Sequence, residues 1–79
     1  MQIKQLAPYK YAVKDRKIDV LVTIRKKVKD EVFRLDPDTV YVFLPTYVMK
    51  IVGKGAKSHA DKIQESVLEF IALTHIEIE

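Results

Sequence analysis

The clearest pattern in the chain is an alternation of apolar and polar positions in its first third. Over residues 9–14, tyrosine and valine at every second position alternate with lysine and alanine. Residues 18–28 continue the period of two with branched aliphatic residues, broken only at Lys26, and their other face is largely polar and basic. A period of two is typical of half-buried strands. The pattern predicts a short strand and then a longer one with a basic, solvated face.

Residues 24–35 fit two structures. Ile24, Val28, Val32 and Leu35 also form a helical stripe. In a helix, however, the basic residues 25–27 would lie at the positive N-terminal end, and the macrodipole opposes that arrangement. The pattern therefore favours a hairpin that turns near Lys29-Asp30, with the helix as the alternative.

The middle of the chain predicts a turn followed by a strand. In "LDPDT" at 35–39, Pro37 fixes φ, and the flanking aspartates can hydrogen-bond the local backbone. The segment "TVYVFL" at 39–44 is β-branched and aromatic, as strands are. Pro45 then ends the strand and suits the first position of a helix.

Residues 46–52 are open between helix and strand. A helix would gather Val48, Ile51 and Val52 on one face and end at Gly53, whereas the aromatic and β-branched content favours a strand. Beyond them, Ser58 and Asp61 resemble a capping box. An amphipathic helix of about four turns is predicted after it, with Ala60, Ile63, Val67, Phe70 and Ile71 on its apolar face. The alternation at 75–79 predicts a terminal strand.

These elements predict a small α+β domain: an antiparallel sheet with two helices packed on one face. The 79 residues form one domain, with a basic strand and hairpin region at 1–38 and a βααβ core at 39–79. Cysteine is absent, which excludes disulfides and thiolate metal sites. No segment has the pattern of a signal peptide or a membrane span, so a cytoplasmic protein is expected. Abundant charge without asparagine or tryptophan suits a thermophile.

Charge is distributed unevenly along the chain. Residues 1–35 contain ten Lys/Arg and four acidic residues, a net of +6, whereas residues 36–79 contain four Lys and seven acidic residues, a net of −3. A basic half is what a polyanion-binding protein presents, and it is equally what a solvated sheet face presents.

The two glycines of the chain, Gly53 and Gly55, flank one lysine, with Lys50 and Lys57 close by. Two glycines and a serine can simply form a corner between two elements. Alternatively, a glycine loop lets a phosphate approach the backbone closely, next to the N-terminal end of a helix. Such phosphate contacts provide affinity and salt dependence without sequence choice.

The segment "LPTYVMKIVGKGAKSHADKIQ" resembles the core of a K-homology (KH) domain, in which a GxxG loop joins two helices. The resemblance covers residues 39–79 and implies a loop made by Gly53 to Ala56 that grips single-stranded nucleic acid. It also implies a groove for the bases, lined by Val48, Ile51, Val52 and Ile63. Ala56 stands where the family has glycine, and the apolar face of the next helix falls one residue late. If residues 46–52 form a strand instead, the C-terminal half of the chain is similar to Alba-type chromatin and RNA-binding proteins.

Single-stranded RNA or DNA binding without catalysis is therefore the expected function. The candidate nucleic-acid-binding residues are Arg25, Lys26, Lys27, Lys50, Gly53, Lys54, Gly55, Ala56, Lys57 and Ser58. The alternative is a protein-interaction module of KH-like or Alba-like fold, in which an edge strand pairs with a partner or a second copy.

An enzyme is not expected, since "GKGAKS" lacks the spacing of a nucleotide-binding loop and Ser58 and His59 do not form a nucleophile–base pair. Catalytic residues, a metal, a cofactor, a small-molecule substrate and a membrane partner are likewise not expected. His59 and His75 are too few and too far apart in sequence to predict a metal site. Exposed aromatic residues could stack bases, although aromatic residues more often belong to the core.

Overall fold

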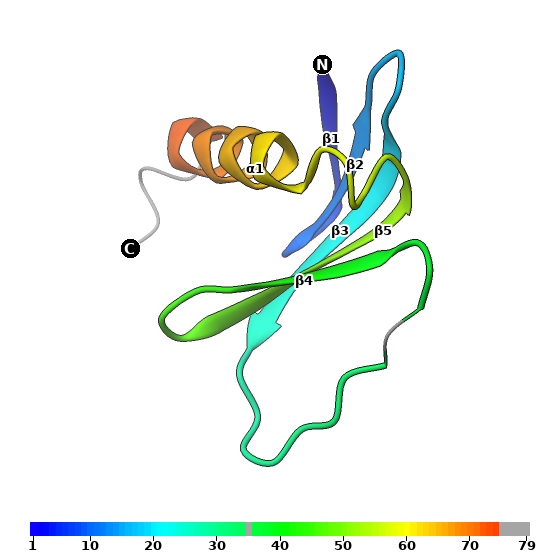
Figure 1. The fold of residues 1–79 in the computed structure, drawn as a ribbon. Coiled ribbons are helices and arrows are strands. Elements are labelled where there is room, and N and C mark those ends of the chain that lie inside the picture. Colours follow the sequence, from blue (N-terminus) through cyan, green and yellow to red (C-terminus); the bar gives the residue numbers. More distant parts are fainter. Residues whose placement is uncertain (35, 75–79) are drawn as a thin grey trace.

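The computed structural model describes residues 1–34 and 36–74. In that part of the chain, five antiparallel strands form one sheet in the order β1-β2-β3-β5-β4, and a helix lies across one face of it (Figure 1). The elements are β1 (Gln2–Ala7), β2 (Lys10–Lys14), β3 (Asp19–Lys26), β4 (Thr39–Phe43), β5 (Tyr47–Lys54) and α1 (Ala60–Thr74).

The prediction of two helices, and with it the KH-like βααβ core, is wrong. The described residues contain one helix, and the segment 46–52 belongs to β5. This strand pairs with β3 along its whole length and with β4 from Val48 to Val52. Its β-branched residues suit such an inner position, and pairing on both sides satisfies backbone groups that a short helix would leave free at its ends.

The hairpin predicted at 24–35 does not form, although the chain turns where it was expected to turn. The chain does turn at Lys29-Asp30, where Asp30 has a φ of 63°. Residues 31–34 nevertheless form no strand, because β5 pairs with β3 in the position that a returning strand would occupy. Residues 27–34 and 36–38 instead belong to a long connection from β3 to β4 that extends from the end of the sheet far from α1 (Figure 1).

Strand β1 was not predicted, because Gln2–Ala7 shows no alternation that marks a buried face. It pairs with β2 from Gln2↔Lys14 to Ala7↔Lys10, with an irregularity at Leu6. Ile3, its one core-facing apolar residue, packs against the main cluster. A largely polar strand can still complete the sheet when its neighbour supplies the hydrogen bonds.

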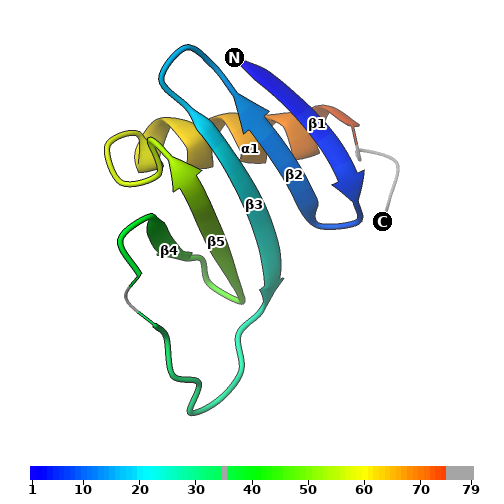
Figure 2. The same cartoon turned by 90° about the vertical axis from the view of Figure 1, so that its right-hand side faces the viewer.

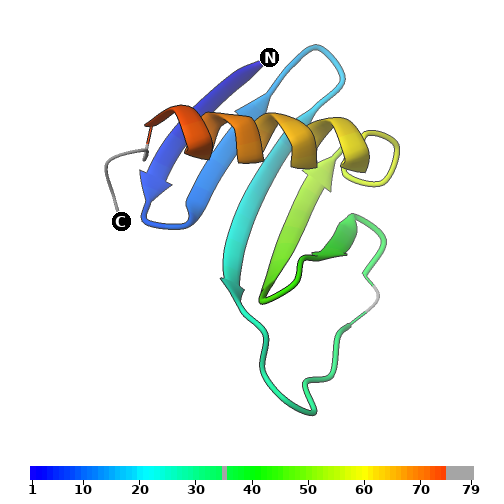
Figure 3. The ribbon, with the colours of Figure 1, turned by 90° about the vertical axis from the view of Figure 1, so that its left-hand side faces the viewer.

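The hydrophobic core lies between the sheet and α1. Figure 3 shows α1 crossing β1, β2, β3 and β5 near one end of the sheet. Ile63 and Val67 of the helix are fully buried against the inward side chains of the strands, and Phe70 packs edge-on against Tyr11. The buried strand residues in this cluster are Tyr11, Val13, Val20, Val22, Ile24, Met49 and Ile51.

The predicted amphipathic helix is confirmed, with a start slightly later than the Ser58–Asp61 pattern indicates. The first helical hydrogen bond runs from the N–H of Ile63 to the carbonyl of His59, so His59 occupies the cap position. The strand predicted at 75–79 lies outside the described residues.

The contact between α1 and the sheet can be tested with Ile63→Ala, which removes a fully buried side chain. The expected cost is about 2 to 5 kcal/mol of unfolding free energy, because the cavity adds to the lost burial. Leu73→Ala removes a side chain of the same helix that is 72% exposed and should change stability by less than about 0.5 kcal/mol. Urea unfolding measures both, and equal losses would contradict this packing.

Candidate nucleic-acid interface

The sheet face turned away from α1 carries a concentration of lysines. Because Tyr11, Val22 and Ile51 point toward the helix, their strand neighbours point to the opposite side. Figure 2 looks onto this side, with α1 behind the sheet. We call it the basic face, and its lysines are Lys4, Lys10, Lys14, Lys50 and Lys54.

The register arranges four of these lysines in two rows across the strands. One row runs Gln2, Lys14, Asp19, Lys54, and the other runs Lys10, Thr23, Lys50, Tyr41. Between them lies a row that is mostly apolar and consists of Lys4, Ala12, Leu21, Val52 and Thr39. Neighbouring strands are about 4.8 Å apart and successive rows about 7 Å apart in a sheet of this kind. Ammonium groups therefore border an apolar strip on both sides.

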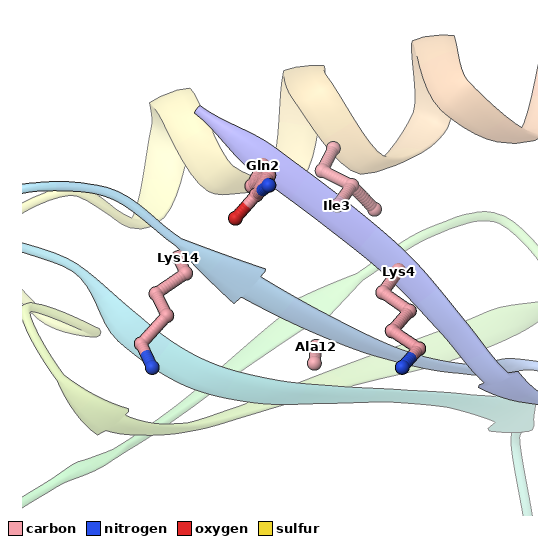
Figure 4. A pocket seen from close by; sticks show the side chains of 5 residues that line it. All are labelled: Gln2, Ile3, Lys4, Ala12 and Lys14. Atoms are coloured by element: carbon pink, nitrogen blue, oxygen red, sulfur yellow. The ribbon is translucent and has the colours of Figure 1, made fainter.

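At the β1 edge, the basic face is hollowed into a shallow pocket. Its lining residues are Gln2, Ile3, Lys4, Ala12 and Lys14. Figure 4 shows Lys4 and Lys14 on either side of the small Ala12 side chain, on the side of the sheet away from the helix. Since alanine leaves room between two cations, the pocket is suited to a small anionic group.

The opposite layer of the molecule has the opposite charge. Helix α1 exposes three carboxylates, those of Asp61, Glu65 and Glu69, and a single lysine, Lys62. The Nζ of Lys62 lies 3.7 Å from a carboxylate oxygen of Asp15, so part of its charge is compensated. A hydrogen bond from the Arg16 N–H, followed by smaller effects that include Lys62, lowers the pKa of Asp15 below its ordinary value. Positive charge thus gathers on one face and negative charge on the other.

The glycine segment that the sequence singled out packs against the turn between β2 and β3. Gly53 has a φ of 134° and Gly55 a φ of 83°, a region that side chains disfavour. A Cβ at Gly53 would overlap the carbonyl oxygen of Asp19, and one at Gly55 would overlap that of Lys17. The structure therefore requires glycine at both positions, because two backbone segments approach each other closely there.

The rest of the predicted loop divides into buried and exposed parts. Ala56 is 1% exposed and belongs to the core, whereas the side chains of Lys57 and Ser58 are exposed. The N–H of Gly53 donates to Asp38, that of Ala56 to Gly53, and that of His59 to Gly55. These three N–H groups are therefore used within the protein, whereas the charged side chains of Lys54 and Lys57 are exposed.

The groove residues implied by the KH resemblance do not lie on a common surface. Ile51 and Ile63 are buried in the core beneath α1, and Val48 is buried on the other face of the sheet. Val52 lies in the apolar row of the basic face.

The basic residues at the end of β3 lie apart from the glycine segment. Arg25 pairs in register with Val48, six residues along β5 from Lys54, which corresponds to roughly 20 Å. The guanidinium of Arg25 donates two hydrogen bonds to the Glu31 carboxylate, one of them 2.6 Å long, and these raise the pKa of Arg25. Lys26 pairs with Tyr47 on the helix side of the sheet. Lys27 lies over an aromatic ring, with its Nζ 5.9 Å from the centre of Phe43.

Three aromatic rings meet at this end of the basic face, and we call them the aromatic cluster: Phe33, Tyr41 and Phe43. Phe33 from the β3–β4 connection packs edge-on against Tyr41 at 4.7 Å and Phe43 at 5.2 Å between ring centres. The Arg25 guanidinium lies 5.8 Å from the centre of the Phe33 ring. Val48, beneath this region, is 1% exposed, so the end of the sheet is covered.

The structure thus brings Lys50 and Lys54 together with three lysines that sequence reasoning missed, Lys4, Lys10 and Lys14. A signal for two of them was present, since Lys10 and Lys14 alternate with the buried Tyr11 and Val13. Lys4 had no such signal, because its strand lacks a buried partner at every second position.

Residues 1–34 and 36–74 contain no group of three or more His, Cys, Asp or Glu side chains that could hold a metal ion. No helix in the same ranges is long and apolar enough to cross a bilayer. The Tyr11 hydroxyl has a raised pKa because it is buried, with a smaller effect from Tyr9.

Comparison of the chain with protein-family models, curated proteins and solved structures gave no match. The resemblances to KH and Alba-type proteins stay predictions.

The structural role of the glycines predicts a large cost for Gly53→Ala. Strain at positive φ and overlap with the Asp19 carbonyl should reduce the unfolding free energy by about 2 kcal/mol or more. Lys54→Ala, at the exposed position between the glycines, is the matched control and should cost less than about 0.5 kcal/mol. Chemical denaturation of both variants tests this, and a Gly53→Ala variant as stable as the wild type would show that the close approach is not required.

Proposed function

We propose that this chain binds single-stranded nucleic acid, RNA or DNA, through its basic face and without catalysing a reaction. The observation that supports the proposal most directly is the separation of charge. Five lysines and one aspartate, Asp19, occupy the paired strand positions of the basic face, while three carboxylates face solvent from α1 on the other side. A polyanion is the class of ligand that such a surface attracts.

In the proposed complex, the two lysine rows contact phosphates and the apolar row between them contacts sugars and bases. Lysine side chains are flexible point charges, so they follow a backbone without selecting a sequence. The proposal includes Lys57, which lies three residues beyond Lys54 in the turn before α1 and is exposed. The candidate residues Lys50, Lys54 and Lys57 thus belong to the proposed site through their side chains.

A protein-interaction module remains the alternative, in which the basic face or an edge strand pairs with another protein. A cytoplasmic location is part of the proposal and follows from the expectation drawn from the sequence. Failure to bind RNA or DNA even at low salt would favour the alternative.

The basic face can be tested with the double variant Lys14→Gln/Lys50→Gln, which removes one charge from each lysine row. Affinity for a short single-stranded RNA or DNA should fall. The slope of log affinity against log salt should also become shallower by about 1.4, since each lost phosphate contact accounts for about 0.7 on single strands. Fluorescence anisotropy at several salt concentrations measures both quantities.

The matched control is Lys29→Gln/Lys62→Gln, which removes the same charge from the β3–β4 connection and from α1. Its salt slope should equal that of the wild type. If both double variants lose affinity equally, net charge alone controls binding and the basic face is not the site.

The Arg25–Glu31 pair provides a second test of the same surface. Two parallel hydrogen bonds from a guanidinium to a carboxylate have the geometry with which arginine also binds phosphate. Glu31→Gln removes the competing charge, so affinity should increase several-fold and the salt slope should steepen by about 0.7 as one more phosphate contact forms.

Glu69→Gln on α1 makes the same change of charge far from the basic face and should leave the salt slope unchanged. If Glu31→Gln binds no more tightly than Glu69→Gln, Arg25 does not belong to the proposed site.

A further inference from the structure

The aromatic cluster is not explained by packing of the main core. It lies on the side of the sheet opposite α1, at the end of the basic face, and one of its rings remains open to solvent. Phe43 is 58% exposed although it occupies a regular strand position. A large apolar ring left in water at the end of a row of cations is a feature that a ligand could use.

The cluster holds this ring in a fixed position. Phe33 contacts both Tyr41 and Phe43 edge-on, at interplanar angles of 63° and 89°. Tyr41 and Phe43 are two residues apart on β4 and therefore project from the same face. Because Phe33 supports the two rings from one side, the exposed part of Phe43 is available without rearrangement of the cluster.

One cation lies over the exposed ring, and a second belongs to the neighbouring register position. Lys27 places its Nζ 5.9 Å from the centre of Phe43, and Lys50 is the register partner of Tyr41. Side chains directly opposite each other on antiparallel strands have Cβ atoms about 5 Å apart. A base that stacks on Phe43 would displace the flexible Lys27 side chain from over the ring and bring its ammonium group beside an adjacent phosphate. Lys50 lies two residues along β5 from Val48, the register partner of Phe43, and is available to the phosphate on that side.

Resting on the proposed function, we propose that Phe43, supported by Phe33 and Tyr41, is a stacking platform for an unpaired base of the nucleic acid bound to the basic face. The phosphates next to that base contact Lys27 and Lys50. In a duplex the bases are stacked on one another and cannot lie flat on the ring. The platform therefore makes the surface selective for single strands, and since every base has a π-face, it selects no particular sequence.

The test compares Phe43→Leu with Tyr9→Leu. Tyr9 is 56% exposed in the turn between β1 and β2, so the control removes an aromatic ring of similar exposure elsewhere. Phe43→Leu should weaken binding of a single-stranded oligonucleotide roughly tenfold, a loss within the range for one stacked base. Its salt slope should match that of the wild type, because no phosphate contact is removed. Tyr9→Leu should bind as the wild type does, and Phe43→Trp should restore the affinity.

A second ligand separates stacking from any structural effect of the substitution. An oligonucleotide of the same length with an abasic backbone keeps its phosphates and has no base to stack. Phe43→Leu should bind it with the same affinity as the wild type. If Phe43→Leu weakens abasic and natural ligands equally, the ring acts on the shape of the site and the stacking proposal is wrong.

The outcomes also distinguish this proposal from the function on which it rests. A chain that binds no oligonucleotide at low salt overturns the proposed function and the platform together. A chain that binds through Lys14 and Lys50, with Phe43→Leu equal to Tyr9→Leu, keeps the function and overturns the platform alone. Equal affinity of the wild type for single strands and for a duplex of the same sequence would likewise overturn it.

Discussion

The contact between the glycine segment and the turn joining β2 to β3 determines how the rest of the molecule is arranged. Gly53 and Gly55 bring the end of β5 against the backbones of Asp19 and Lys17, closer than any side chain would permit. The chain then has only residues 55–59 in which to leave the sheet before α1 begins. This short connection places the helix across one face of the sheet, so the side chains of the opposite face stay in solvent.

The basic face follows from that arrangement together with the pleat of the strands. Because Tyr11, Val22 and Ile51 point into the core under α1, the alternation of side chains along each strand directs the neighbouring lysines to the opposite face. Antiparallel register then aligns lysines from strands that are distant in sequence. The same alternation of side chains therefore forms both the core and the basic face. The proposed function needs no structural element beyond the sheet itself.

The sequence predicted some elements well, for identifiable reasons. β2 and β3 alternate clearly, β4 is rich in β-branched and aromatic residues, and α1 has an apolar stripe, so local pattern was sufficient for each of them. The error at 46–52 arose because β5 is an inner strand, with Val48 and Met49 both buried, and such a strand lacks strict alternation. β1 was missed for the opposite reason, since most of its side chains are exposed. In both cases pairing with neighbouring strands decides the structure: β1 pairs with β2, and β5 pairs with β4 and with the distant β3.

The candidate site was predicted in part. Lys50 and Lys54 were identified through their nearness to the glycines, yet the structure groups them with lysines of β1 and β2 that are far away in the chain. The burial of Ala56 and the pairing of Arg25 with Glu31 depend on tertiary contacts that no local motif encodes. A short motif can therefore draw attention to a segment whose glycines serve a structural purpose that the motif does not indicate.

The opposite charges of the two layers also affect how the molecule meets a ligand. Because the lysines lie on one side of the sheet and the carboxylates of α1 on the other, the molecule has an electric dipole moment roughly perpendicular to the sheet. In the field of a polyanion, this moment rotates the molecule so that its basic face leads before any contact forms. For the proposed polyanionic ligand, approaches with the basic face leading would be favoured over approaches with the helix leading, and the association rate, as well as the affinity, would be sensitive to salt.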